Sequence, residues 1–481
     1  MPIPTSMLLR RPVTLADPLA ALRALEGLPH VFLLEAAVPG SRTAWSLFGA
    51  DPFAIHRGGD WNTAVEAWRE AARSLAPSSI EAEAPQPPFT GGAVGYWSYD
   101  FGRRFERLPA IARDDLQLPD FVMGLYDIVG AYEHESRRAW LFATGLPLAG
   151  DAAQARARER LDVFARRLES SSPTSTPASL DTVSPARVAH STFSADQYRR
   201  AIESVREHIR RGDIFQANLS QRWSLAIDPA TRSAGALSRA LYAALAGVSP
   251  APFAACFDAG DHAIASASPE LFLDVRGRHV TTRPIKGTRP RGMCKAEDDG
   301  LAAELVASGK DRAENVMIVD VLRNDLGRVC EAGTVMVPEL CALETFPQVF
   351  HLTSTVTGTL REEVDAFDLL RAAFPGGSIT GAPKIRAMEI LESLEPIRRH
   401  IYTGSMGYVG WSGDAAWNIA IRTALVTPAA LHFSAGGGIT AESNPDAEFL
   451  ETLHKVEGMR LALGRVLGPI RLDALARGAV A

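Results

Sequence analysis

Lys286 is the residue whose setting most favours covalent chemistry, in the stretch RPIKGTRPR (residues 283–291). The β-branched residues 279–282 predict a strand that ends at Pro284, because proline cannot donate to a ladder. Lys286 would then lie at the end of that strand, where backbone is exposed. A lysine in such a place attacks carbon when desolvation leaves its amine neutral. A solvated loop lysine is the alternative from this stretch alone.

A candidate partner for this amine is Glu270, which lies sixteen residues before Lys286. A strand–turn–strand between the two residues would return the chain and bring carboxylate and amine together. An adjacent acid and base of this kind suits general catalysis during carbon–oxygen cleavage. An exposed turn glutamate fits the spacing equally well.

A second carboxylate stands on the predicted helix 311–325, DRAENVMIVDVLRND. Glu314 shares a face of this helix with the apolar residues Met317, Ile318 and Val321, at i+3, i+4 and i+7. A carboxylate on a core-facing stripe is costly unless it is paired or bound to a metal. The pattern therefore favours a buried functional role over a solvated one.

The last predicted helix carries Glu448, Glu451 and Lys455 at i, i+3 and i+7. Taken alone, this spacing predicts an ordinary charged outer face. Two or three glutamates from separate helices would also suit Mg²⁺, which takes its remaining contacts from water and a carboxylate substrate. No His/Cys cluster in the sequence offers a zinc site instead.

Two glycine-rich stretches, GGSITGAPK (376–384) and GGGIT (436–440), could bind a carboxylate. Their backbone N–H groups and hydroxyls are the donors that an anion needs. Arg422 lies in NIAIRT (418–423), which we expect to be an alternating strand, and could add a bidentate clamp. A purely structural arginine is the alternative.

Composition limits the classes of protein. The chain has 481 residues and a formal net charge of −6, which argues against non-specific nucleic-acid binding. Without a signal-peptide core or an apolar run of membrane-spanning length, we expect a cytoplasmic protein that binds neither nucleic acid nor membrane. The four cysteines have no CxxC spacing, which is typical of reduced thiols.

The elements that must position these side chains predict an α+β fold. Many strands of mixed order alternate with helices, among them helices over 61–75, 151–169 and 194–211, and this order disfavours a doubly wound parallel sheet. A Ser/Thr/Pro-rich stretch marks a connector. We therefore expect an N-terminal region over 1–170, a linker over 171–192 and a catalytic domain over 193–470.

Six motifs make the sequence recognisable: PIKGTRPR, DRAENVMIVDVLRNDLGRV, GGSITGAPK, YTGSMGYVG, NIAIRT and AGGGIT. Together they closely resemble the chorismate-utilising enzymes, which include anthranilate, aminodeoxychorismate, isochorismate and salicylate synthases. The match covers roughly residues 194–465, and the N-terminal third, with GYWSYDFGRR, resembles the family more weakly. The resemblance implies a large two-sheet, sandwich-like core with helices packed outside, as in anthranilate synthase component I.

Within that family, the residues at two positions are expected to distinguish which reaction a member catalyses. Anthranilate synthases carry alanine where this chain has Lys286, and water-adding members carry a lysine base where it has Gln216. The pair implies amination of chorismate at C4 through a covalent lysine intermediate, towards p-aminobenzoate and folate. The alternatives are anthranilate synthase component I and a non-catalytic relative that binds a dicarboxylate.

The resemblance also implies roles for individual residues. Lys286 would be the nucleophile and Glu270 the acid, while Glu314, Glu451 and Glu448 would hold Mg²⁺. Groups expected to grip chorismate are Gln216, Thr288, His351, Ser378, Thr380, Tyr402, Arg422, Gly436, Gly437, Gly438, Thr440 and Lys455. None of the cysteines stands in a glutaminase elbow, Gly-x-Cys-x-Gly, so we expect a separate glutaminase subunit to supply ammonia.

A tryptophan pocket is a further expectation from the resemblance. Its residues would be Ala36, Trp45, Pro252, Phe253 and Ala254. Ala36 replaces the serine that is usual in feedback-inhibited anthranilate synthases. We therefore expect a tryptophan bound there to be structural rather than regulatory.

Overall fold

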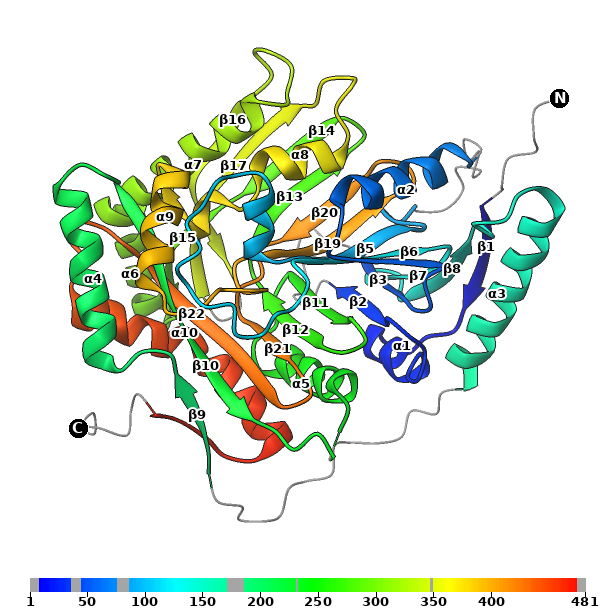
Figure 1. The fold of residues 1–481 in the computed structure, drawn as a ribbon, viewed down its shortest axis with the longest axis horizontal. Coiled ribbons are helices and arrows are strands. Elements are labelled where there is room, and N and C mark those ends of the chain that lie inside the picture. The colour runs from blue at the N-terminus through cyan, green and yellow to red at the C-terminus, as the bar shows by residue number, and fades with distance from the viewer. Residues whose placement is uncertain are drawn as a thin grey trace.

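The computed structural model describes residues 8–35, 45–75, 86–170, 186–230, 232–346 and 349–473. Two large sheets form its centre, and helices cover their outer faces (Figure 1). The predicted α+β class and the two-sheet core with outer helices are confirmed. Among the described residues, no helix combines the length and the apolar character needed to cross a membrane.

The first sheet follows the order β1-β8-β7-β3-β2-β11-β12-β21-β22-β10-β9-β23, with β18 also paired to β10. All its pairs are antiparallel except β9 with β23. Its strands are β1 (Leu9–Val13), β2 (Phe32–Glu35), β3 (Trp45–Gly49), β7 (Ile128–Glu133), β8 (Arg138–Ala143), β9 (Arg187–Ser191), β10 (Gln216–Ala226), β11 (Phe253–Asp258), β12 (Ala263–Ser268), β18 (Gly381–Ala382), β21 (Thr423–Val426), β22 (Ala430–Ile439) and β23 (Ile470–Leu472).

The second sheet follows the order β15-β17-β14-β13-β20-β19-β5-β6-β4, and β16 also pairs with β17. Its strands are β4 (Ala54–Arg57), β5 (Gly92–Trp97), β6 (Phe121–Tyr126), β13 (Leu271–Arg276), β14 (His279–Arg283), β15 (Ile285–Pro290), β16 (Met336–Thr345), β17 (Val349–Thr359), β19 (Ser405–Gly410) and β20 (Ala415–Asn418).

The helices predicted over 61–75, 151–169, 194–211 and 311–325 are present, and each begins and ends within two residues of those bounds. For example, Ser194 caps α4 and forms a capping box with Gln197. The helices are α1 (Pro18–Ala24), α2 (Trp61–Arg73), α3 (Gly150–Ser170), α4 (Ala195–Arg210), α5 (Ala234–Val248), α6 (Lys295–Ala307), α7 (Gly309–Gly327), α8 (Ala366–Ala373), α9 (Lys384–Leu394) and α10 (Pro445–Leu467), with short 3₁₀ turns η1 (Tyr99–Arg104) and η2 (Gly377–Ile379).

Three apolar clusters hold the layers together. One lies between the sheets and contains Phe32 of the first sheet and Tyr96 of the second. Another packs the first sheet against helices that include α3, α5 and α10, and a third packs the second sheet against α2, α7 and α8. Burial of these side chains is the main favourable term for folding, and it orders the molecule as helix, sheet, sheet, helix.

The N-terminal region and the catalytic region interleave. Strands β1, β2, β3, β7 and β8 belong to the first sheet, while β4, β5 and β6 belong to the second. In both sheets they pair with later strands, β2 with β11 and β5 with β19. Of the predicted linker, 171–185 lie outside the described residues, and Arg187–Ser191 form β9.

Two local expectations are corrected by the structure. The predicted strand does end before Pro284, since β14 stops at Arg283, but Lys286 does not lie at a free strand end: β15 begins at Ile285 and, like β14, pairs with β17. Pro284 marks a break between two strands because it has no N–H to give to the ladder. Residues 419–422 are not a strand but the connection between β20 and β21, which belong to different sheets.

Candidate active site

Lys286 lies in a bulge of β15. The pairing with β17 shifts register between Ile285 and Thr288, and Gly287 has φ +79°, which favours glycine. The bulge turns Lys286 so that its Nζ donates a hydrogen bond of 2.8 Å to the carbonyl oxygen of Ser378. The amine is thereby fixed against the glycine-rich loop that contains η2.

Glu270 reaches the same loop through the predicted hairpin. It directly precedes β13, and β13 pairs with β14 so that Leu271 lies opposite Arg283. Its side chain is buried, and burial raises its pKa against the opposing effects of a hydrogen bond with Ser378 and the charge of Lys286. A raised pKa favours the protonated carboxyl, so Glu270 is suited to donate a proton beside Lys286.

Glu314 of α7 faces Gln216, the first residue of β10. The Nε2 of Gln216 makes a long contact of 3.5 Å with Oε2 of Glu314, and the Oε1 of Gln216 is buried without a hydrogen-bond partner. Burial raises the pKa of Glu314, although Lys286 and Lys310 act against this. Glu314 forms no ion pair within the described part of the chain. The predicted inward orientation of this carboxylate is present.

Glu448 and Glu451 of α10 come close to the same place. The outer-face prediction is wrong for Glu448, which is only 4% exposed and accepts a 2.6 Å hydrogen bond from Ser443 Oγ. Lys310 Nζ lies 3.3 Å from Glu448 Oε1, and Lys455 Nζ lies 2.6 Å from Glu451 Oε1. Burial would raise the pKa of Glu451, but the neighbouring lysines outweigh it and lower that pKa.

The three carboxylates meet around two adjacent glycines of β22. A Cβ on Gly437 would lie 2.9 Å from Glu448 Oε2 and 3.9 Å from Glu451 Oε1, and one on Gly438 would lie 3.5 Å from Glu314 Oε2. Among the described residues, no three His, Cys, Asp or Glu side chains are close enough to hold a metal by themselves. A cation here would need further oxygen ligands, which suits Mg²⁺ with water and a carboxylate substrate.

Arg422 provides a cation for which the described residues offer no counter-charge. Its backbone has φ +49°, its side chain is largely buried, and burial alone lowers its pKa. No hydrogen bond or ion pair of this guanidinium is found within the described residues. Nearby, His351 Nδ1 lies 2.9 Å from Thr288 Oγ1, and burial together with the charge of Arg422 lowers the pKa of His351 to about 4. An unpaired guanidinium beside a neutral imidazole is suited to receive a carboxylate.

The remaining predicted substrate groups are distributed around this centre. Lys455 Nζ donates to the carbonyl of Gly436 at 2.9 Å, and the Thr440 N–H donates to Ser443 Oγ at 3.0 Å. Two predicted hydroxyls are engaged within the protein instead: Thr380 Oγ1 donates to the Gly376 carbonyl at 3.0 Å, and Tyr402 is buried against Asn218.

Lys310 and Ser443 were not predicted from the sequence, yet both contact Glu448. The sequence did contain a signal for Lys310, since it lies four residues before Glu314 on one helix and therefore on the same face. Ser443 carries no such signal, because its contact depends on the turn that leads into α10.

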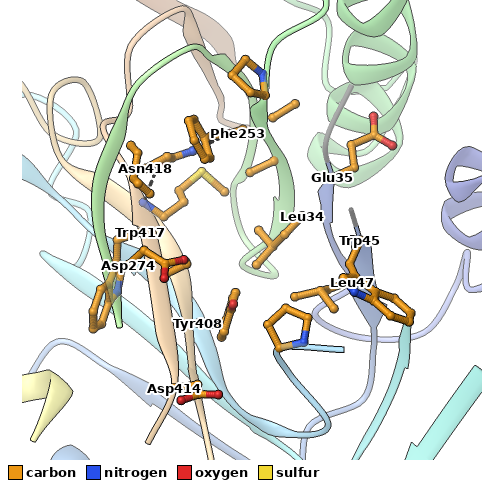
Figure 2. Close-up of a pocket in the computed structure, with 18 of the residues that line it drawn as sticks. Leu34, Glu35, Trp45, Leu47, Phe253, Asp274, Tyr408, Asp414, Trp417 and Asn418 are labelled. Atoms are coloured by element: carbon orange, nitrogen blue, oxygen red, sulfur yellow. Dashed lines mark hydrogen bonds between the residues drawn. The ribbon is translucent and has the colours of Figure 1, made fainter. Parts of the chain in front are cut away.

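A separate cavity of about 680 Å³ lies between the two sheets (Figure 2). Four of the residues expected in a tryptophan pocket, Trp45, Pro252, Phe253 and Ala254, line this cavity, whereas Ala36 lies outside the described residues. Figure 2 shows the carboxylate of Glu35 at its upper end, and burial raises the pKa of Glu35 to about 7. Lys286 is not among the residues that line the cavity, and neither are Glu270, Glu314, Glu448 and Glu451.

Comparison with known proteins places this geometry in a family. Residues 31–460 match the model of the chorismate binding enzymes. The chain belongs to that family. It is 37% identical over 450 residues to aminodeoxychorismate synthase component 1 of Bacillus subtilis, covering 90% of this chain and 92% of that protein. It is 38% identical over 466 residues to anthranilate synthase component 1 of Thermus thermophilus, covering 95% of this chain and 96% of that protein.

Solved structures agree with this membership. The crystal structure of anthranilate synthase component I from Streptococcus pneumoniae superposes with a TM-score of 0.70 at 28% identity, covering 88% of this chain and 94% of that chain. Relatives with two different activities are thus about equally similar to this chain. Overall similarity does not separate the two activities, and individual residues of the site must do so.

Proposed function

We propose that this protein is an aminodeoxychorismate synthase, which converts chorismate and ammonia to 4-amino-4-deoxychorismate. The observation that carries the proposal is the placement of Lys286, whose amine is held 2.8 Å from the Ser378 carbonyl next to the buried Glu270. Anthranilate synthases are also similar to this chain, and the family resemblance implies alanine in place of Lys286 in those enzymes. The curated relatives named for the same activity support the proposal.

The proposed reaction consists of two allylic displacements. The neutral amine of Lys286 attacks C2 of chorismate, the ring double bond shifts, and the C4–O bond breaks while Glu270 gives its proton to the leaving hydroxyl, which departs as water. Ammonia then attacks C4, the double bond shifts back, and the C2–N bond breaks to release the amine of Lys286. Protons lost by the two nitrogens return to Glu270 and solvent, so the net products are aminodeoxychorismate and water.

The surrounding groups would bind and orient the substrate. Arg422 has no hydrogen-bond or ion-pair partner among the described side chains and would clamp one carboxylate, with His351 and Thr288 beside it. Glu314, Glu448 and Glu451 would hold Mg²⁺, which when bound supplies positive charge that neutralises and orients the other carboxylate. Gln216 cannot deprotonate water, which disfavours the isochorismate-forming reaction.

Ammonia would come from a glutaminase subunit, and we propose the cytoplasm as the site of action. The component 1 names of the relatives support a partner subunit. The four cysteines are free, and three of them are buried, so none is available as an exposed glutaminase nucleophile except Cys294. Cys294 precedes α6 in the stretch RGMCKAE, which is not a Gly-x-Cys-x-Gly elbow. Free thiols also fit a reducing compartment.

Incubation of the protein with chorismate, Mg²⁺ and an ammonium salt tests the proposed activity. Formation of aminodeoxychorismate without pyruvate supports it. Formation of anthranilate with pyruvate would instead assign the chain to the tryptophan branch. No turnover of chorismate, with binding retained, would support a non-catalytic relative.

For the cavity in Figure 2 we propose tryptophan as a structural ligand. Its volume suits a small molecule, and its walls include the aromatic side chains of Trp45, Phe253 and Tyr408. Calorimetric titration with tryptophan, with phenylalanine for comparison, measures the binding. Bound tryptophan should raise the Tm without inhibiting turnover, and absence of binding to the purified, ligand-free protein would refute the assignment.

A further inference from the structure

A buried ion pair lies behind the loop that holds Lys286 and Glu270. Glu395 follows the last residue of α9, and Arg399 lies four residues later in the sequence. Their side chains are 8% and 3% exposed, and two hydrogen bonds of 2.8 and 2.7 Å join the guanidinium to the carboxylate. A buried ion pair of this geometry is not by itself stabilising, so its other contacts are informative.

Those other contacts connect two walls of the active site. Glu395 Oε1 accepts from the N–H and the hydroxyl of Ser220 on β10, each at 2.9 Å. Arg399 donates to the carbonyl of Asn218 on the same strand and, at 3.0 Å, to the carbonyl of Ile379. The pair thus connects β10, which begins with Gln216, to the η2 loop.

Ile379 directly follows Ser378, and Ser378 is the residue that Lys286 and Glu270 share. Its carbonyl accepts from Lys286 Nζ, and its side chain hydrogen-bonds Glu270. A change in the position of the Ile379 carbonyl therefore moves the contacts of both reacting groups together. We propose that Arg399, held by Glu395, is a positioning residue: it fixes where the side chain of Lys286 lies relative to that of Glu270. The proposal rests on the function proposed above for those two residues.

A neighbouring ion pair provides a matched control. Glu392 lies three residues before Glu395 on α9 and pairs with Arg103, and both side chains are mostly buried. This pair binds η1 and the chain near residue 111, where the N–H groups of Ile111 and Ala112 donate to Glu392 Oε1. Among the described residues this pair makes no hydrogen bond or ion pair with the η2 loop, so its loss perturbs α9 without moving Ser378.

The experiment compares R399K and the double variant E395Q/R399Q with R103K in the full-length protein. R399K keeps the positive charge but loses the several N–H donors of the planar guanidinium. The double variant E395Q/R399Q removes both charges, so no unpaired charge remains buried. We expect kcat with chorismate and ammonium to fall about 10-fold in R399K and about 100-fold in E395Q/R399Q, because misplacement of about 1 Å can cost that much. The KM for chorismate should change by less than about threefold, and R103K should keep both constants.

Amide hydrogen exchange in the segment 376–380 provides a readout that does not need activity. Exchange in this segment should accelerate in both Arg399 variants and stay unchanged in R103K. Folded variants with wild-type kcat and wild-type exchange in 376–380 would overturn the proposal, as would an equal loss of kcat in R103K. If the wild-type protein itself makes no aminodeoxychorismate, the proposed function fails, whereas the exchange result still reports whether Arg399 orders the loop.

Discussion

The Lys286 site and the cavity of Figure 2 are both built where strands of the two sheets meet, yet they differ in kind. The Lys286 site gathers buried ionisable groups: Glu270 and Glu314 have raised pKa values, and Arg422 has no counter-charge within the part of the chain that the structure describes. The cavity is walled mainly by apolar and aromatic side chains, with Glu35 at one end. Unpaired buried charge costs folding free energy and is kept for chemistry, whereas an apolar cavity mainly requires shape.

The largest expected effect comes from replacing Lys286 by alanine. Loss of the attacking amine should lower the rate of aminodeoxychorismate formation at least about 1000-fold, because no other group can form the bond to C2. Quantification of the product by chromatography measures the loss. An unchanged rate would show that no covalent bond to Lys286 is needed. The contrast between a reactive Lys286 site and an apolar cavity would then lose its main support.

The next effect concerns Glu270. Since its pKa is raised, the carboxyl keeps its proton to higher pH than an ordinary glutamate, and kcat should fall as pH rises through that pKa. The amide of E270Q cannot give up a proton, so kcat should drop roughly 100-fold. The decrease of kcat with rising pH should also disappear in this variant. A pH–rate profile of both proteins measures it. If kcat of E270Q still decreased with rising pH in the same way, another group would be the acid.

Replacing Arg422 should affect binding more than turnover. R422Q should raise the KM for chorismate roughly 10- to 100-fold, the range expected for the loss of a charge-assisted bidentate contact. R422K should restore little, because an ammonium cannot form the same fork. The free energy of unfolding should not decrease, since none of the described residues forms a hydrogen bond or ion pair with the native guanidinium. A strongly lowered Tm would show that Arg422 has a structural role instead.

The smallest effect is expected from replacing Glu35 in the cavity, and it concerns the free energy of unfolding alone. The pKa of Glu35 rises from the ordinary 4.5 to about 7 in the folded protein. Between these values the unfolded chain loses its proton first, so Glu35 lowers the free energy of unfolding as pH rises and has its full effect above pH 7. E35Q should therefore be more stable than the wild type by about 1–3 kcal/mol at pH 8 and equal to it near pH 4.5.

Denaturant titrations at the two pH values measure this difference, and activity should stay unchanged in E35Q. A constant difference in stability across that pH range would show that burial does not perturb Glu35.

The sequence predicted the fold class, and it predicted the positions of some candidate site residues better than the contacts around them. Glu314 could be placed inward because its neighbours on one helix face are apolar, and the Glu270 hairpin followed from strand spacing. Glu448 was misplaced because its burial depends on Ser443 and Lys310, which lie on other segments. Lys286 lies in a bulge rather than at a strand end because β17 pairs with both β14 and β15, a long-range fact that local patterns do not contain.

The interleaving of the chain has a consequence for any shortened version of this protein. A fragment that began after residue 192 would lose β2 and β5, and the backbone groups of β11 and β19 that pair with them would be left open. Exposed strand edges beside apolar surface recruit other chains into aggregates. The catalytic segment is therefore expected to precipitate when expressed alone and to regain solubility when residues 1–170 are supplied as a second polypeptide.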